Sequence, residues 1–129
     1  MSCLQNTKIL IVDDEDVLLE IIHEELSSLG AAVKTAEDGE TALEILGAES
    51  FDIIVTDQSM PGINGSELLE QYHNLKGKTS AAVYVLLTGY DPDSIIFEDE
   101  TVRPLVRFVS KPLRMPDFIS TLTELKKVA

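Results

Sequence analysis

Five short apolar runs alternate along the chain with segments of helical periodicity, and this alternation constrains the fold more than any other feature. Most of the runs are rich in β-branched residues, and polar or turn-forming residues bound them, which is typical of buried strands in a parallel sheet. They occupy residues 8–14, 31–36, 51–57, 81–89 and 105–109. Each crossover between parallel strands is right-handed and covers one face of the sheet. The pattern therefore predicts an α/β domain, a doubly wound five-stranded parallel sheet with helices on both faces, and leaves the strand order open.

Five helices are expected, and they begin near Asp16, Asp38, Gly65, Asp91 and Asp117. The third is expected to include the apolar residues Leu68, Leu69, Tyr72 and Leu75. In the fourth, Asp91 has the residue type of an N-cap and Pro92 that of a first helical position, so they predict a short helix that extends through Ile96. Phe97 is expected to be exposed on the surface of this helix.

The bulk composition favours one domain and excludes some partners. The 129 residues contain no internal repeat or low-complexity linker, so a single domain over residues 1–129 is expected, with its core at about residues 8–125. A formal net charge of -13 opposes binding to nucleic acid or anionic membranes and suits basic partners or cations. Cys3, the only cysteine, cannot form an internal disulfide, and no stretch reads as an export signal or a membrane span. We expect a soluble cytoplasmic protein.

Side chains that can carry chemistry stand at the carboxyl ends of four predicted strands: Asp13 and Asp14, Asp57, Thr88, and Lys111. In a parallel sheet these ends lie along one edge, where α/β proteins bind ligands. Three carboxylates in one place repel one another unless a hard cation compensates, and oxygen ligands are those that Mg2+ prefers. The pattern predicts a Mg2+ site, with Mn2+ as an alternative ion. Asp57 is the candidate nucleophile for an aspartyl phosphate, with Thr88 and Lys111 suited to the phosphoryl oxygens.

These residues resemble the receiver domain of two-component response regulators, which has a CheY-like, flavodoxin-like fold. The resemblance covers about residues 8–125 and rests on Asp13-Asp14, on Asp57 with MPGING after it, on Thr88-Gly89 and on Lys111-Pro112. It implies the strand order 2-1-3-4-5 and a phosphorelay in which a histidine kinase phosphohistidine, or a phosphotransfer protein, donates a phosphoryl group to Asp57. It also implies that Asp14, Asp57 and the backbone carbonyl of Ser59 hold Mg2+, with Asp13 often acting through water. The Lys111–Pro112 peptide bond is expected to be cis.

The same resemblance implies a switch. Thr88 would move toward the phosphoryl group and Phe108, three residues before the lysine, would turn inward into the vacated space, which remodels the surface of the fourth helix, fifth strand and fifth helix. Ser59 and Tyr90 are implied to tune the lifetime of the phosphoryl group. Such a receiver is a signalling domain that catalyses only its own phosphorylation and dephosphorylation, and it acts on an output partner that the sequence does not name.

Three other functions are less well supported. A degenerate receiver would bind partners without phosphorylation, but here every catalytic position is filled. A haloacid-dehalogenase-like phosphatase needs Asp-x-Asp-x-Thr or Val after its first strand, and residues 14–18 depart from this at Leu18. A flavodoxin-like FMN carrier needs a phosphate cradle where this chain has two aspartates, which would repel a phosphate. His23 and His73 lack a metal-ligand partner at close spacing, so both are interpreted as surface residues.

Overall fold

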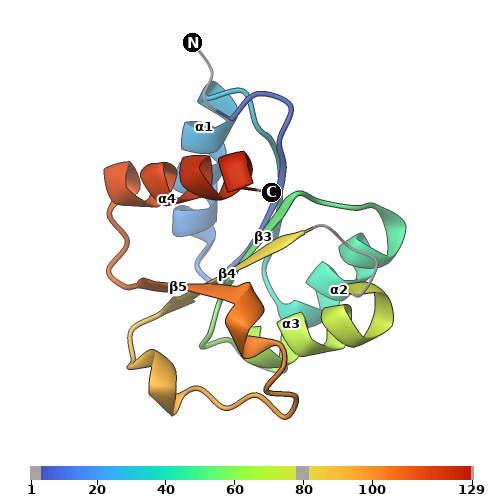
Figure 1. Ribbon diagram of the computed structural model, residues 1–129. Helices are drawn as coiled ribbons and strands as arrows, with labels where there is room; N and C mark the ends of the chain where they lie inside the picture. Colours follow the sequence, from blue (N-terminus) through green and yellow to red (C-terminus); the bar gives the residue numbers. More distant parts are fainter. Residues whose placement is uncertain (1–3, 78–81, 129) are drawn as a thin grey trace.

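The computed structural model describes residues 4–77 and 82–128, and its centre is a parallel sheet between two layers of helices (Figure 1). The five strands are β1 (Lys8–Val12), β2 (Ala32–Ala36), β3 (Ile53–Asp57), β4 (Val83–Thr88) and β5 (Val106–Ser110). Their order is β2-β1-β3-β4-β5, and every neighbouring pair is parallel. This confirms the doubly wound fold and its strand order. The first residue of the predicted fourth run, Ala81, and Cys3 lie outside the described residues.

Two helices cover each face of the sheet. On one face lie α1 (Asp16–Ser28) and α4 (Met115–Val128), and on the other lie α2 (Gly39–Ala48) and α3 (Gly65–Tyr72) (Figure 1). The two apolar cores that result share the strands, because successive side chains of a strand point to opposite faces. The central strand β3 is buried along its whole length, which explains its nearly continuous apolar sequence. No helix among the described residues is long and apolar enough to cross a membrane.

Two details differ from the expected helix ends. The last helix begins at Met115 rather than near Asp117. After α3 the chain continues as a π-helical turn, His73–Gly77, in which the side chain of Leu75 is 77% exposed. The predicted helical run therefore does not continue to Leu75, because the chain leaves regular α-helical geometry after Tyr72.

The predicted fourth helix does not form, so the described residues contain four α-helices rather than five. A single 3-10 turn, Pro92–Ser94, takes its place and ends where Ile95 adopts an extended ψ of 126°. Beyond it, Ile95 and Phe97 are buried and Ile96 is 80% exposed. This alternation has the period of two of an extended chain rather than the 3.6 of a helix. Phe97 is only 3% exposed, so the expectation of an exposed Phe97 is also wrong.

Candidate functional site

Asp57 is the last residue of β3 and is 5% exposed at the carboxyl edge of the sheet. The turn that follows brings the first residue of α3, Gly65, against this strand end, where its amide donates to the carbonyl of Gln58 at 3.1 Å. A Cβ on Gly65 would lie 2.4 Å from the carbonyl oxygen of Asp57 and 2.6 Å from Cδ1 of Leu86. Only glycine permits this approach, so the helix start holds the acid in place.

Gln58 also positions this turn, a role that the sequence did not suggest. Its Oε1 accepts from the amide of Ser66 at 2.8 Å, and its Nε2 lies 3.2 Å from Oγ of Ser66. The side chain of Asn64 caps α3 in a reciprocal capping box with Glu67. In the sequence, an Asn with a Glu three residues later is a signal for such a capping box, and it could have located the start of α3 but not the role of Gln58. Together these bonds hold residues 58–64 beside the acid.

Three carboxylates converge at the predicted edge. Asp13 and Asp14 follow β1, and Asp57 ends β3. One carboxylate oxygen from each of the three residues lies within 4.8 Å of the corresponding oxygens of the other two. Asp13 is fully buried, and its Oδ1 accepts from the amide of Glu15 at 2.9 Å, whereas Asp14 is exposed. Carboxylate oxygens at this spacing form a donor set that suits a hard divalent cation.

Lys111, directly after β5, reaches back over this cluster. Its Nζ lies 3.2 Å from Oδ2 of Asp57, 3.5 Å from Oδ2 of Asp13 and 4.0 Å from Oε1 of Glu15. The Lys111–Pro112 peptide bond, expected to be cis, is cis. The ammonium group thus joins strand ends that are far apart in the sequence, and Glu15 is a further acid that the sequence analysis did not single out.

Burial and charge act in opposite directions on these groups. Burial raises the pKa of Asp57, and the charge of Asp13 raises it further, against the effects of Lys111 and of the backbone amide of Ser59. Burial would lower the pKa of Lys111, but Asp57 and Asp13 outweigh it, and that pKa lies above its ordinary value. One ammonium faces three carboxylates, so the cluster is short of positive charge.

The remaining predicted site residues lie on β4, on β5 and in the loops after β3 and β4. Thr88, 2% exposed at the end of β4, accepts a hydrogen bond at Oγ1 from the amide of Tyr90 at 3.0 Å. The Tyr90 side chain is 69% exposed. Phe108 is partly buried against the core on the α2 and α3 face. Ser59 and Tyr90 help to line an open pocket of about 510 Å³ next to the acid, and its other lining residues are Gln58, Met60, Pro61, Asn64, Ser94 and Ile95.

The two histidines lie apart from this site. His23 is exposed on α1, in agreement with its interpretation as a surface residue. His73 is half-buried, and its Nδ1 is 3.2 Å from the hydroxyl of Tyr84. Within the described residues, the one group of acids, cysteines or histidines spaced to hold a metal is the Asp13, Asp14 and Asp57 cluster.

Comparisons with known proteins give one consistent family. The model of the response regulator receiver domain matches residues 9–123. Regulator of RpoS from Escherichia coli K12 is 41% identical over 80 residues, which are 62% of this chain and 24% of that protein. Virulence sensor protein BvgS from Bordetella bronchiseptica is 43% identical over 61 residues, which are 47% of this chain and 5% of that protein. The chain thus spans a quarter or less of the length of these curated relatives.

Solved structures agree with the fold. The response regulator TrrA of Thermotoga maritima, in complex with Mg(2+)-BeF, has a TM-score of 0.76 and 30% identity, covering 92% of this chain and 98% of that one. CheY4, a chemotaxis response regulator of Vibrio cholerae, has a TM-score of 0.79 at 24% identity over 92% of this chain and 98% of its own, a likeness of fold alone. With the acid cluster at the strand ends and the family model matching residues 9–123, this chain belongs to the response regulator receiver domain family.

Proposed function

We propose that this chain is a phosphoryl-accepting receiver, which takes a phosphoryl group from the phosphohistidine of a histidine kinase or phosphotransfer protein onto Asp57. The observation that carries the proposal is the buried carboxylate of Asp57 paired with Lys111 Nζ at 3.2 Å, beside two more carboxylates from a neighbouring strand. This arrangement has a nucleophile, a mobile cation for phosphoryl oxygens and a donor set for a divalent ion.

In the transfer, an Oδ atom of Asp57 attacks the phosphorus atom and forms an acyl phosphate O–P bond. The N–P bond of the phosphohistidine breaks, and the imidazole nitrogen keeps the electron pair and takes up a proton from solvent. Lys111 supports the reaction because its ammonium already lies beside Oδ2 of Asp57 and can follow the phosphoryl oxygens. Thr88 contributes a hydroxyl from the end of the adjacent strand β4.

Mg2+ is the cofactor that fits this site, with Mn2+ as an alternative. Asp14, Asp57 and the backbone carbonyl of Ser59 would hold it, and Asp13 would act through water. When bound, the ion supplies positive charge that offsets the carboxylates and the transferred phosphoryl oxygens. The excess of carboxylates over cations among the described residues of the cluster supports this assignment.

The switch of this receiver would begin at Thr88 and Phe108. Movement of Thr88 toward the phosphoryl group takes its hydroxyl away from the amide of Tyr90, and the half-buried Phe108 turns into the space that is left. The predicted helix between β4 and β5 does not form, so the surface that changes would consist of residues 90–105, β5 and α4. Ser59 and Tyr90, which line the pocket beside Asp57, would set how easily water reaches the phosphoryl group.

The proposal also covers the extent of the domain, its location in the cell and its mode of action. The domain would comprise residues 1–129, act in the cytoplasm as a signalling receiver rather than as a classical enzyme, and regulate an output protein through its changed surface. The names of two relatives, Virulence sensor protein BvgS and Sensor histidine kinase RcsC of Salmonella typhimurium, support a histidine kinase as the source of the phosphoryl group.

The test is intact mass and peptide mapping of the protein after incubation with acetyl phosphate, with and without Mg2+. We expect one phosphoryl group on Asp57, only with Mg2+, and none at that site in Asp57→Asn. Asp52→Asn is the matched control, because Asp52 precedes the same strand at its opposite end and its carboxylate accepts from the amide of Lys8. An adduct on another acid, or none on a folded protein, would refute the proposal and favour phosphorylation-independent binding.

A further inference from the structure

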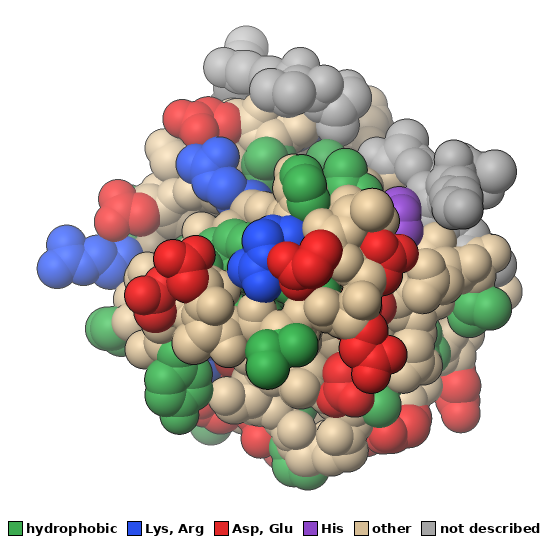
Figure 2. Space-filling model, turned by 60° about the horizontal axis from the view of Figure 1, so that its bottom comes forward, with side chains coloured by type: hydrophobic (Ala, Val, Ile, Leu, Met, Phe, Trp, Pro, Cys, Tyr) green, Lys and Arg blue, Asp and Glu red, His purple; other side chains and the backbone are tan. Residues whose placement is uncertain are grey.

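Residues 90–105, which we call the strap, connect β4 to β5 in place of a helix. The strap contains five acidic residues and one basic residue, Arg103. It lies at the bottom of the view in Figure 1, and Figure 2 turns that side forward to show acidic and hydrophobic side chains with few basic ones among them. An acidic segment whose regular structure is limited to the 3-10 turns Pro92–Ser94 and Arg103–Leu105 needs specific contacts to keep one conformation.

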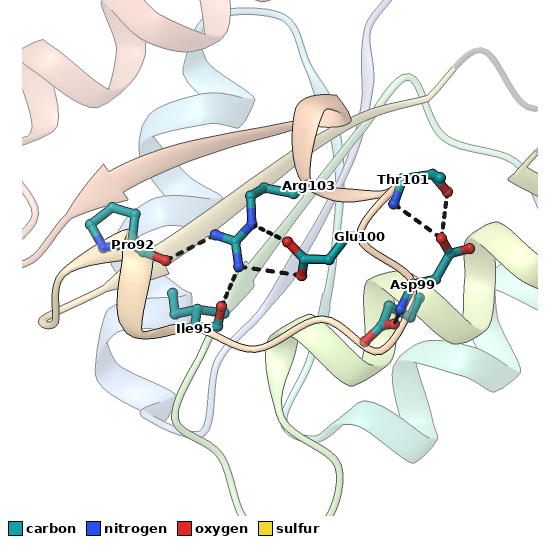
Figure 3. Close-up of polar contacts among 7 residues, drawn as sticks. Pro92, Ile95, Asp99, Glu100, Thr101 and Arg103 are labelled. Carbon is teal, nitrogen blue, oxygen red and sulfur yellow. Dashed lines mark hydrogen bonds and ion pairs between the residues drawn. The ribbon is translucent and has the colours of Figure 1, made fainter.

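Arg103 supplies these contacts by joining the two ends of the strap (Figure 3). Its Nη1 donates to the carbonyl of Pro92 at 3.1 Å, and its Nη2 donates to the carbonyl of Ile95. Nε and Nη2 form a fork on the carboxylate of Glu100, at 2.9 and 3.5 Å. The guanidinium carbon also lies 5.1 Å from the centre of the buried Phe97 ring. One side chain thus holds the 3-10 turn, the extended part and the acidic part of the strap together.

A second tether connects the middle of the strap to α3. Glu70 is 7% exposed, and its Oε2 accepts from the backbone amide of Asp99 at 2.7 Å. The carboxylate of Asp99 in turn accepts from the amide and the hydroxyl of Thr101. The middle of the strap is therefore fixed to a helix, whereas Arg103 connects the first turn of the strap to its end.

That first turn is attached directly to the candidate site. The amide of Tyr90 donates to Thr88 Oγ1 at 3.0 Å, and Asp91 caps the turn by accepting from the amide of Asp93 at 3.0 Å. Only three residues separate Tyr90 from Ser94, and the next residue, Ile95, has its carbonyl held by Arg103. Movement of the Thr88 hydroxyl toward a phosphoryl group would remove the acceptor of the Tyr90 amide and release the start of the turn that Arg103 restrains.

We propose that Arg103 is a positioning residue, a latch that stabilises the resting position of the strap and thereby opposes the switch at Asp57. The inference rests on the proposed function, because it takes the movement of Thr88 as its input. If Arg103 stabilises the resting state, a ligand that prefers the switched state has to overcome this stabilisation when it binds. Removing the latch should therefore increase the affinity for that ligand. Lysine cannot replace the latch, because one ammonium does not reproduce the planar fork that reaches two carbonyls and a carboxylate.

The test combines hydrogen exchange with binding of beryllofluoride and Mg2+ to the full chain. In the native protein we expect beryllofluoride to speed exchange of the strap amides. In Arg103→Gln and Arg103→Lys the strap should exchange about tenfold faster without any ligand, because charged hydrogen bonds to two carbonyls are lost. Beryllofluoride affinity, measured by fluorine NMR titration, should rise about fivefold or more in both variants.

Lys34→Gln is the matched control for the loss of a positive charge from an ion pair. Lys34 lies on β2, at the edge of the sheet opposite to β5, its side chain is 56% exposed, and it pairs with Glu49. This variant should leave both strap exchange and beryllofluoride affinity unchanged. Glu100→Gln weakens the fork without touching the carbonyl contacts, and it should shift both measurements in the direction of Arg103→Gln by a smaller amount, even if the arginine variants fold poorly.

Two results separate the possible failures. Faster strap exchange with unchanged beryllofluoride affinity in the Arg103 variants would overturn the latch and leave Arg103 a purely structural residue. No beryllofluoride binding to the native protein in the presence of Mg2+ would instead overturn the proposed function, and the latch with it.

Discussion

Replacing Phe97 with alanine tests whether the strap is part of the core, and we expect a large loss of stability. The side chain is 3% exposed and packs in one cluster with Ile95 and Val102, beneath the guanidinium of Arg103. Removing a buried phenylalanine ring costs about 3–5 kcal/mol, and the lost cation–π contact adds about 0.5–1 kcal/mol at a partly exposed site. Because the strap can relax into part of the cavity, we expect a net loss of about 3–4 kcal/mol.

The assay is urea unfolding followed by circular dichroism, with thermal melting as a second measurement. At this chain length about 4 °C of Tm corresponds to 1 kcal/mol, so Tm should fall by about 12–16 °C. Ile96→Ala is the matched control, because Ile96 is the next residue along the strap and is 80% exposed, and it should change stability by less than about 0.5 kcal/mol. Equal effects of the two variants would refute the burial argument. A new early transition would show instead that the strap unfolds separately from the sheet.

Four further predictions concern the acid cluster and its surroundings. Burial raises the pKa of Asp57 in the metal-free protein, so the ionised carboxylate destabilises the folded state as pH rises from the ordinary pKa of 3.8 through the raised one. Asp57→Asn should therefore increase the free energy of unfolding at pH 7, measured by urea titration of the metal-free protein in the presence of a chelator. This gain should disappear as the pH is lowered toward 4. Asp14→Ala should weaken Mg2+ binding in calorimetry and relieve repulsion, and a lower metal-free Tm would contradict this. Lys111→Ala should impair the beryllofluoride-induced change of the strap more than Mg2+ binding; a lost Mg2+ site with intact switching would refute that role. Tyr90→Asp should lose its phosphoryl group faster than the native protein in a dephosphorylation time course, and an equal or slower rate would remove Tyr90 as a shield.

The strands and the acid cluster could be predicted from the sequence because their signals are local. The Ile-Ile-Val run of β3 supplies apolar side chains to both faces, so it has to lie inside a sheet, and Asp57 at the carboxyl end of that strand has to reach the sheet edge. Asp13, Asp14 and Asp57 meet in the structure for this reason, and parallel pairing of β1 with β3 aligns their ends.

The strap could not be predicted, because its conformation depends on residues remote in the sequence. Asp91 and Pro92 do start a helical turn, as their types predict, but the turn does not propagate. Burial of Ile95 and Phe97 two positions apart favours an extended chain, and the buried Glu70 binds the Asp99 amide across 29 positions. Helix propensity amounts to tenths of a kcal/mol per residue, and burial of an aromatic ring outweighs it.

By itself, then, the sequence determined the sheet, the two-sided helical layers and the identity of the acids that meet at its edge, since periodicity and strand ends are properties of short stretches. The strand order followed only from resemblance to a family. Tertiary structure decided which partners the polar side chains take: Lys111 spans Asp57 and Asp13, and Arg103 holds the strap. The physical reason is that a hydrogen bond or an ion pair depends on three-dimensional proximity, which the packing of distant segments creates.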